Sequence, residues 1–252
     1  MTTDTHAIAT DSPAIQLTND TPAIQKRSRR WRVLRVLGLG LLLAVAVSIA
    51  GHFAWKSSGS NQWVKKIDKN GIQVWSRKAP GAMLTDIKAL RRIKNTPTVA
   101  IASFMQESCE DFMPGCVAGY DVEPWNPRTL SSTGLWVVIY PLKMTPREYL
   151  LRTQIAQDPK SKAVSMRVTA HPDLVPRNKY CYRVEHVDNR WVFTPLGNGE
   201  TEVEFTMHMD QGMPYLLMNL VSPRVTYKIM DELPAHFDKP QYQNAKLDYI
   251  KE

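Results

Sequence analysis

The sequence has few residues of the kinds that build catalytic and metal centres. It contains three cysteines and six histidines in 252 residues, and none of them stands at the spacing of a CxxC pair or of two helical metal ligands. The motifs HExxH, GxSxG and GxGxxG and the phosphate-binding loop are also absent. The sequence therefore predicts no catalytic residue, no metal site and no cofactor, and it excludes the enzyme classes that these motifs mark.

Aromatic residues are missing from the first 30 positions, which are rich in Thr, Asp, Pro and Ala. A six-residue pattern occurs twice there, as DSPAIQ at residues 11–16 and as DTPAIQ at residues 20–25. A segment of this composition cannot bury enough apolar surface to offset the entropy of ordering it. We therefore expect residues 1–30 to form a disordered tail; a docking motif for a cytoplasmic partner is the alternative.

Only one stretch of the sequence is long, apolar and uncharged, the 20 residues from Val36 to Trp55. At about 1.5 Å per residue, a helix of this length spans about 30 Å, the thickness of the hydrocarbon core of a bilayer. It predicts one transmembrane helix within residues 31–56, with Trp31 and Trp55 in the headgroup layers. A signal peptide cleaved after Ala50 is the alternative. A helix buried in a soluble core would need a polar face, which this one lacks.

Positive charge before the apolar run predicts the orientation in the membrane. Six basic residues lie between Lys26 and Arg35, whereas only Lys56 follows the run before Lys65. Because positive flanks stay in the cytoplasm, we expect a cytoplasmic N-terminus and a domain on the non-cytoplasmic, periplasmic side. We place a linker at residues 57–62, the domain at 63–238 and a polar, frayed tail at 239–252.

The formal net charge of +8 is concentrated near the apolar segment. Residues 1–59 contain 7 Lys and Arg and 3 Asp and Glu, which leaves 25 and 21 in the remainder, a net charge of +4. A mixed surface of this kind does not require a nucleic-acid partner. The residues from position 60 onward are numerous enough for one well-filled core.

The cysteines leave two interpretations open. Cys109 and Cys116 can pair across a short loop in an oxidising compartment, which would leave Cys181 as a free thiol. Three reduced and buried thiols are the alternative.

Turn signals and alternating polarity divide the domain into a hairpin, a helix, a series of strands and a long C-terminal helix. Asn70-Gly71 marks the first turn, and Asp188-Asn189 is interpreted as a later one. The predicted elements are the end of a short helix at 63–66, strands at 72–77 and 83–93, a helix at 96–113, strands at 119–125, 128–140, 163–170, 180–187, 190–196 and 201–210, and a helix at 213–233. This order predicts an α+β fold, with a curved antiparallel sheet wrapped around the long C-terminal helix and one transmembrane helix before it.

Several short fragments occur in the order and spacing of one known family. The fragments are Trp63 with NGIQVWSR at 70–77, IYPLKMTPREY at 139–149, Tyr182-Arg183 with Trp191, PLGNGET at 195–201, and DQGMP at 210–214 with Asn219. Together they resemble a START domain, the lipid-transfer module related to steroidogenic acute regulatory protein. The sequence departs from the family pattern at Gln211 and Met213, where Pro and Gly are more usual.

This resemblance implies a helix-grip fold that binds one lipid or sterol-like molecule in an internal tunnel without catalysis, with the C-terminal helix and an adjacent loop as a lid. Large, soft side chains on the expected inner face fit such a tunnel, because methionine adapts to irregular apolar shapes. A solid core made of the same side chains is the alternative. The expected ligand-binding residues are Met166, Val168, Tyr182, Val184, Trp191, Phe193, Val203, Phe205, Met207, Met209, Tyr215, Met218 and Met230.

Charged groups on the strands give no clear headgroup site. If Tyr182 and Val184 face the cavity, period-two alternation places Arg183 on the surface, and this is the interpretation that we expect. An internal pair of Arg183 with an acidic residue is the alternative.

Two other classes of function remain open: a membrane-anchored interaction or assembly factor with a filled core, and an enzyme that acts on a hydrophobic substrate. An ionisable residue inside the cavity without a structural partner would favour the enzyme. Gly40, Ala44 and Ser48 form a row of small residues in the anchor, which predicts at most a weak homodimer.

Overall fold

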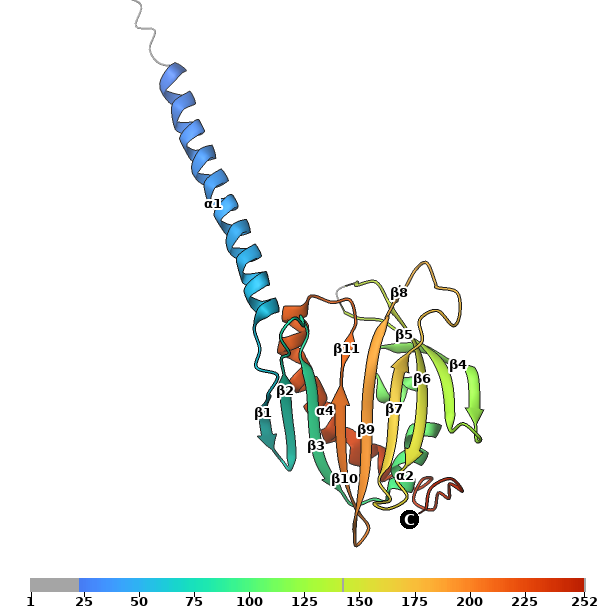
Figure 1. Cartoon of the computed structure of the whole chain (residues 1–252). Helices are drawn as coiled ribbons and strands as arrows, with labels where there is room; N and C mark the ends of the chain where they lie inside the picture. Colours follow the sequence, from blue (N-terminus) through green and yellow to red (C-terminus); the bar gives the residue numbers. More distant parts are fainter. Residues whose placement is uncertain (1–22, 142, 252) are drawn as a thin grey trace, which may run out of the picture. The chain divides into compact units, whose positions relative to one another are not determined.

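The computed structural model describes residues 23–141 and 143–251 (Figure 1). The chain divides into two compact units, one that ends at Phe53 and one that begins at Ala54. Residues 1–22, most of the expected disordered tail, lie outside the described residues. The rest of that segment, residues 23–30, is helical.

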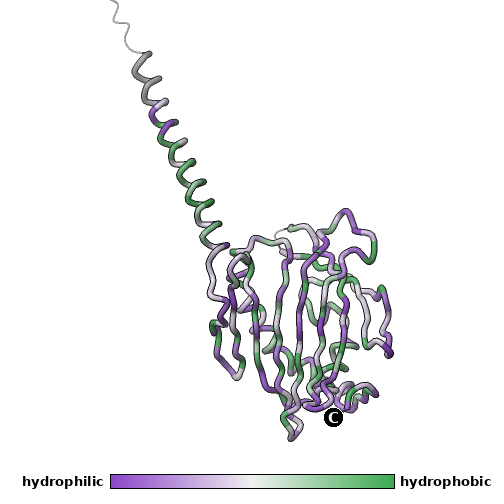
Figure 2. The backbone as a smooth tube through the Cα atoms, viewed as in Figure 1, coloured by the Kyte–Doolittle hydropathy of each residue, from purple (hydrophilic) through white to green (hydrophobic). Residues whose placement is uncertain are grey.

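The first unit contains most of helix α1, Ala23–Ser57. From Arg30 to Ser57 this helix is long and apolar enough to cross a membrane, a property that it shares with signal sequences. Its leucine and valine side chains are exposed, and Figure 2 shows the apolar stretch that they form. A helix that is apolar on all sides is typical of a lipid environment.

The second unit is built on one large sheet, which is antiparallel except where β8 runs parallel to β6. Along the described chain the strands follow the order β1-β2-β3-β10-β9-β7-β6-β5-β4, with β11 added to β9 and β8 to β6. The strands are β1 (Trp63–Lys69), β2 (Ile72–Arg77), β3 (Asp86–Ile93), β4 (Cys116–Asn126), β5 (Ser131–Val138), β6 (Arg147–Gln157), β7 (Val164–Ala170), β8 (Tyr182–Arg183), β9 (His186–Gly197), β10 (Glu200–Met207) and β11 (Met209–Asp210).

Several strand assignments differ from the sequence prediction; the predicted 180–187 strand, for example, is divided between β8 and the start of β9. Residues 63–66 belong to strand β1 and not to a helix, because β1 pairs with β2 through the turn at Asn70 and Gly71, where φ is 53° and 73°. Strand β6 has no counterpart in the prediction. Its first four residues are buried without alternation, so the period-two signal is missing. Asp188-Asn189 is not a turn but lies within β9, paired with β7.

The helices cover one face of the sheet. Helix α2 (Pro97–Gln106) begins at Thr96, whose hydroxyl accepts a hydrogen bond from the amide of Val99, as the sequence predicts. The expected single helix is interrupted after Gln106, because Ser108 forms a capping box with Asp111 and starts a separate short helix, α3 (Cys109–Phe112).

Helix α4 (Tyr215–Phe237) packs against β1, β2, β3 and α2. It is longer than the predicted 213–233 helix at its C-terminal end. Pro223 lies inside it and not near a helix start, and its ring is buried. Because proline removes one helical hydrogen bond, the burial of this face must offset a cost of about 3 kcal/mol.

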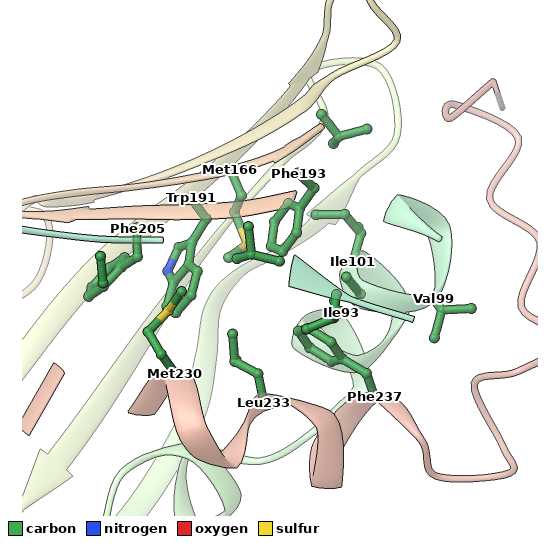
Figure 3. Packing of buried hydrophobic residues seen from close by; sticks show 14 of the residues in the cluster. Ile93, Val99, Ile101, Met166, Trp191, Phe193, Phe205, Met230, Leu233 and Phe237 are labelled. Atoms are coloured by element: carbon green, nitrogen blue, oxygen red, sulfur yellow. The ribbon is translucent and has the colours of Figure 1, made fainter. Parts of the chain in front are cut away.

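The core lies between α2, α4 and the inner face of the sheet. Figure 3 shows Met230 and Leu233 of α4 directed toward Trp191 and Phe193 of β9, and Phe237 beside Ile93 of β3. The core residues that the structure describes all belong to the unit that begins at Ala54. This unit therefore has what an independently folding domain needs.

The C-terminal segment is not frayed. Tyr242 and Ile250 are buried against the core, and the amide of Lys251 donates to the side chain of Gln157 at 2.9 Å. The expectation of a frayed tail is wrong, because residues 239–251 are polar on average but include isolated apolar residues, Tyr242 and Ile250, that pack against the core.

Candidate functional site

A cavity of about 550 Å³ lies between the inner face of the sheet and helices α2, α3 and α4. Strands β4, β5, β6, β7, β9, β10 and β11 form its wall, and the long strands β5, β6, β7, β9 and β10 contribute side chains that alternate with outward-facing ones. Leu233 and Ile229 of α4 and Phe104 and Phe112 of α2 and α3 close the opposite side. The space is therefore enclosed mostly by apolar side chains from segments far apart in the sequence.

Six of the thirteen expected ligand-binding residues line this cavity. They come from four neighbouring strands of the same wall. These residues are Met166, Val168, Trp191, Phe205, Met207 and Met209.

The other seven expected residues lie elsewhere. Phe193, Val203 and Met230 are fully buried in the packed core, where Figure 3 shows Met230 and Phe193 on either side of Trp191. Val184 and Met218 are buried outside the cavity lining. Tyr182 is exposed, and Tyr215 stacks on Trp55 at the start of α4.

The expectation that Arg183 is a surface charge is wrong. Its side chain is 1% exposed, and its guanidinium lies 2.7 Å from the carboxylate of Glu148, which is 5% exposed. The same guanidinium donates to the backbone carbonyls of Pro172 and Pro176. Burial follows because β8 pairs with β6 in parallel and places Arg183 directly opposite Glu148. The pair does not line the cavity, so it holds the 172–183 loop and not a ligand.

A second polar cluster lies beside the cavity, close to the start of α4. The hydroxyls of Tyr140 and Tyr149 are 2.7 Å apart, and Tyr140 donates to the side chain of Gln211. Burial raises the pKa of both tyrosines above the ordinary value, so both phenols are neutral at physiological pH. The buried guanidinium of Arg147 donates to the carbonyl of Gln211. This cluster fixes the turn before α4.

Exposed residues among the cavity lining mark where the cavity opens to solvent. Glu110 of α3, Tyr120 and Asp121 of β4, and Glu232 of α4 are exposed lining residues. The disulfide between Cys109 and Cys116 joins α3 to the first residue of β4 at this rim. Of the two interpretations of the cysteines, pairing is therefore the one found, and Cys181 is a free, half-buried thiol.

Two ionisable residues that line the cavity, Glu107 and His236, are paired with each other. Glu107 accepts from His236 at 2.6 Å and from Lys239 at 2.7 Å, which links the end of α2 to the end of α4. Among the residues that the structure describes, no three His, Cys, Asp or Glu side chains gather where they could hold a metal ion.

Sequence reasoning missed the polar residues of the cavity wall, Asn189 among them. Asn189 occupies an inward position of β9 between Val187 and Trp191, and all three line the cavity. Its Oδ1 atom is buried and has no hydrogen-bond partner in the described structure. The alternation of Val187, Asn189, Trp191 and Phe193 was the available signal, but the Asp-Asn pair resembled a turn.

The arrangement of the second unit resembles that of solved lipid-transfer domains. The STAR-related lipid transfer protein of Xanthomonas axonopodis superposes with a TM-score of 0.64 at 19% identity, over 70% of this chain and 99% of that chain. The lipid transfer and protein localization domain of human StarD13 gives a TM-score of 0.62 at 14% identity, over 72% of this chain and 91% of that one. Human STARD10 also gives 0.62 at 14% identity, over 75% and 78% of the two chains.

No protein-family profile matches the sequence, and no curated protein matches it. The comparison therefore rests on the solved structures, and their similarity to this chain confirms the predicted START-like helix-grip fold.

Proposed function

We propose that residues 54–252 bind one lipid or sterol-like molecule in the cavity and serve its transfer or sensing at a membrane surface without catalysis. The observation that carries this proposal is the cavity itself, about 550 Å³ in volume and walled by Met166, Trp191, Phe205 and Met207. A space of this size and composition falls within the range of small-molecule sites. A solid core would fill it, because ordinary protein interiors contain few voids larger than a water molecule.

The volume limits the size of the ligand. At about 30 Å³ for each water-sized group, the cavity holds roughly 18 such groups. This capacity suits one acyl chain or a small fused-ring compound.

The membrane anchor is the second part of the proposal. In it, α1 crosses the membrane once with the N-terminus in the cytoplasm, and the domain lies on the periplasmic side. The basic residues before the apolar run support this orientation. Tethering would raise the concentration of the domain at the surface from which it takes its ligand.

The first turns of α4 present an apolar surface suited to exchange with a bilayer. Leu216, Leu217 and Leu220 are exposed, although each is large and apolar. They follow Tyr215, which stacks on Trp55 with ring centroids 6.4 Å apart. Because Trp55 ends the apolar run in the sequence, these leucines lie close to the point where the chain leaves the domain toward the anchor.

The absence of catalysis is proposed on chemical grounds. Of the ionisable lining residues, Glu107 and His236 are paired with each other, and Glu110, Asp121 and Glu232 are exposed at the opening. The side chains of β7, β9 and β10 that line the cavity are neutral. General acid–base chemistry requires an ionisable group within reach of the substrate. The proposal therefore assigns the inner wall to binding.

The test is native mass spectrometry of residues 54–252 purified from cells, followed by lipid extraction. We expect one bound hydrophobic molecule per protein. Val168→Trp should abolish its retention, because Val168 lines the cavity, whereas Thr169→Trp on the opposite face of β7 is the matched control. A protein without a bound molecule after incubation with membrane lipids would contradict the proposal and favour an assembly factor. Chemical conversion of a bound molecule would favour an enzyme.

Exchange with the membrane is tested separately. Leu216→Ser combined with Leu220→Ser should slow uptake of a fluorescent hydrophobe from vesicles and leave the amount bound at equilibrium unchanged. Val225→Ser, at an exposed position further along α4, is the control. Equal uptake rates in all three proteins would show that this surface has no part in exchange.

A further inference from the structure

The inner wall of the cavity carries one polar atom for which the protein supplies no partner. Oδ1 of Asn189 is buried, and no described donor reaches it. Asparagine is disfavoured in strand interiors, and burying an unpaired carbonyl oxygen is unfavourable. This atom is occluded in the described conformation, but Asn189 lines the cavity, so a turn of its amide about χ2 would present Oδ1 to a ligand that occupies the cavity.

The register of the sheet places Asn189 in one row with two more polar residues, Thr153 and Ser132, and with Val168. Asn189 of β9 lies opposite Val168 of β7, Val168 opposite Thr153 of β6, and Thr153 opposite Ser132 of β5. All four residues line the cavity. With neighbouring strands about 4.8 Å apart, Asn189 and Thr153 are about 10 Å apart across the wall. The row thus crosses the middle of an otherwise apolar surface, with Met166 and Trp191 on one side and Leu151 and Val187 on the other.

The row contains amide and hydroxyl groups but no charge. Among the described residues that line the cavity, none is Lys or Arg, and the acidic ones are Glu107, Glu110, Asp121 and Glu232. A carboxylate or phosphate in such a space would lose its hydration without gaining a cation. The chemistry of the wall therefore disfavours an anionic headgroup.

We infer that the cavity selects an uncharged hydrophobic molecule carrying a hydroxyl group, which donates a hydrogen bond to Oδ1 of Asn189. Thr153 and Ser132 extend the same polar row for a second polar atom of the ligand. This inference rests on the proposed function and narrows its ligand class: a long-chain or sterol-like alcohol fits, whereas a free fatty acid or a phospholipid headgroup does not.

Three probes of one chain length test the inference: dodecane, dodecanol and dodecanoate. Their dissociation constants for residues 54–252 are measured by displacement of a fluorescent hydrophobe at pH 8. We expect dodecanol to bind at least tenfold more tightly than dodecanoate, because no cation compensates the buried carboxylate. This comparison needs no variant and so does not depend on the folding of one.

The variant Asn189→Leu isolates the hydrogen bond. It should weaken dodecanol binding about three- to tenfold, the loss of one hydrogen bond, and leave dodecane binding unchanged or stronger. Asn189→Ala is the second variant, should the larger side chain disturb folding. Thr169→Val, on the outer face of the neighbouring strand, is the matched control and should alter neither affinity.

The outcomes separate the two proposals. If none of the three probes binds, the proposed function fails and this inference fails with it. If the probes bind and dodecanoate equals or exceeds dodecanol, only the inference is overturned. The same holds if Asn189→Leu weakens dodecane and dodecanol equally, because the residue would then act through the structure of the wall.

Discussion

The buried ion pair between Arg183 and Glu148 allows a quantitative test of how the domain is held together. Two guanidinium nitrogens of Arg183 lie 2.8 and 2.7 Å from one carboxylate oxygen of Glu148. Replacing Arg183 by Met leaves the buried carboxylate without a cation, with only the amide of Asn178 as a donor. It also frees the loop carbonyls of Pro172 and Pro176. Removing one member of such a pair costs about 3–5 kcal/mol. We therefore expect Arg183→Met to lower the free energy of unfolding by that amount.

The assay is urea unfolding of residues 54–252, followed by tryptophan fluorescence. Arg167→Met is the matched control. The pair of Arg167 with Asp188 has side chains that are 60% and 47% exposed, so its loss should cost less than about 1 kcal/mol. Adding Glu148→Leu to Arg183→Met should restore part of the stability, because no buried charge then remains. Equal costs for the two single variants would refute the reasoning and show that Glu148 reaches solvent when its partner is removed.

Three further predictions concern the turn before α4, the rim of the cavity and the free thiol. Gly212 has φ +64°, and a Cβ there would lie 2.4 Å from Cζ of Tyr182, whereas Gly71 has φ +73° and a Cβ there would meet open space. Gly212→Ala should therefore lower the melting temperature more than Gly71→Ala does. Equal shifts would contradict the steric argument. Replacing Cys109 and Cys116 together by Ser should lower the free energy of unfolding by about 2.5 kcal/mol, the loop-closure entropy that the disulfide removes from the unfolded chain. An unchanged midpoint of urea unfolding would show that the bond does not form. Burial raises the pKa of the Cys181 thiol, so its alkylation at pH 8 should be slower in the folded than in the urea-unfolded protein. The raised pKa stabilises the folded state at pH values below the pKa of the thiol in the unfolded chain, and this stabilisation is lost as the pH rises through its pKa in the folded protein. Equal alkylation rates would contradict the raised pKa.

Arg183 shows why alternation alone misplaces charged residues. Period-two reasoning sets neighbouring side chains on opposite faces, and it assumes that the outer face is wet. At the first residues of β6, the 172–183 loop covers the outer face at Glu148, and the turn before α4 covers Arg147 on the other face, so residues on both faces are buried. A loop that covers a strand is a tertiary feature, and no pattern of neighbouring residues in the sequence predicts it.

Asn189 is a second residue that local sequence patterns misplace, in this case an uncharged polar one. An Asp-Asn pair favours a turn when only neighbours in the sequence are considered. In the sheet, β7 pairs with both residues and keeps the strand extended, so that Asn189 faces the cavity and Asp188 faces solvent, where it binds Arg167. Long-range pairing outweighed local turn preference.

The sequence by itself determined the features that depend on near neighbours in the chain. These are the apolar helix and its basic flank, the Asn70-Gly71 turn, the cap at Thr96 and the alternation of most strands. The order of the elements was enough to predict an α+β fold, and the resemblance of short fragments predicted the START-like form of it. Only the tertiary structure decided which inward-facing residues line a cavity and which fill a core. Trp191 and Phe193 have the same orientation on β9, yet only Trp191 borders the cavity. The reason is that empty space depends on how far α2 and α4 approach each strand, and that distance is set by packing across the whole domain.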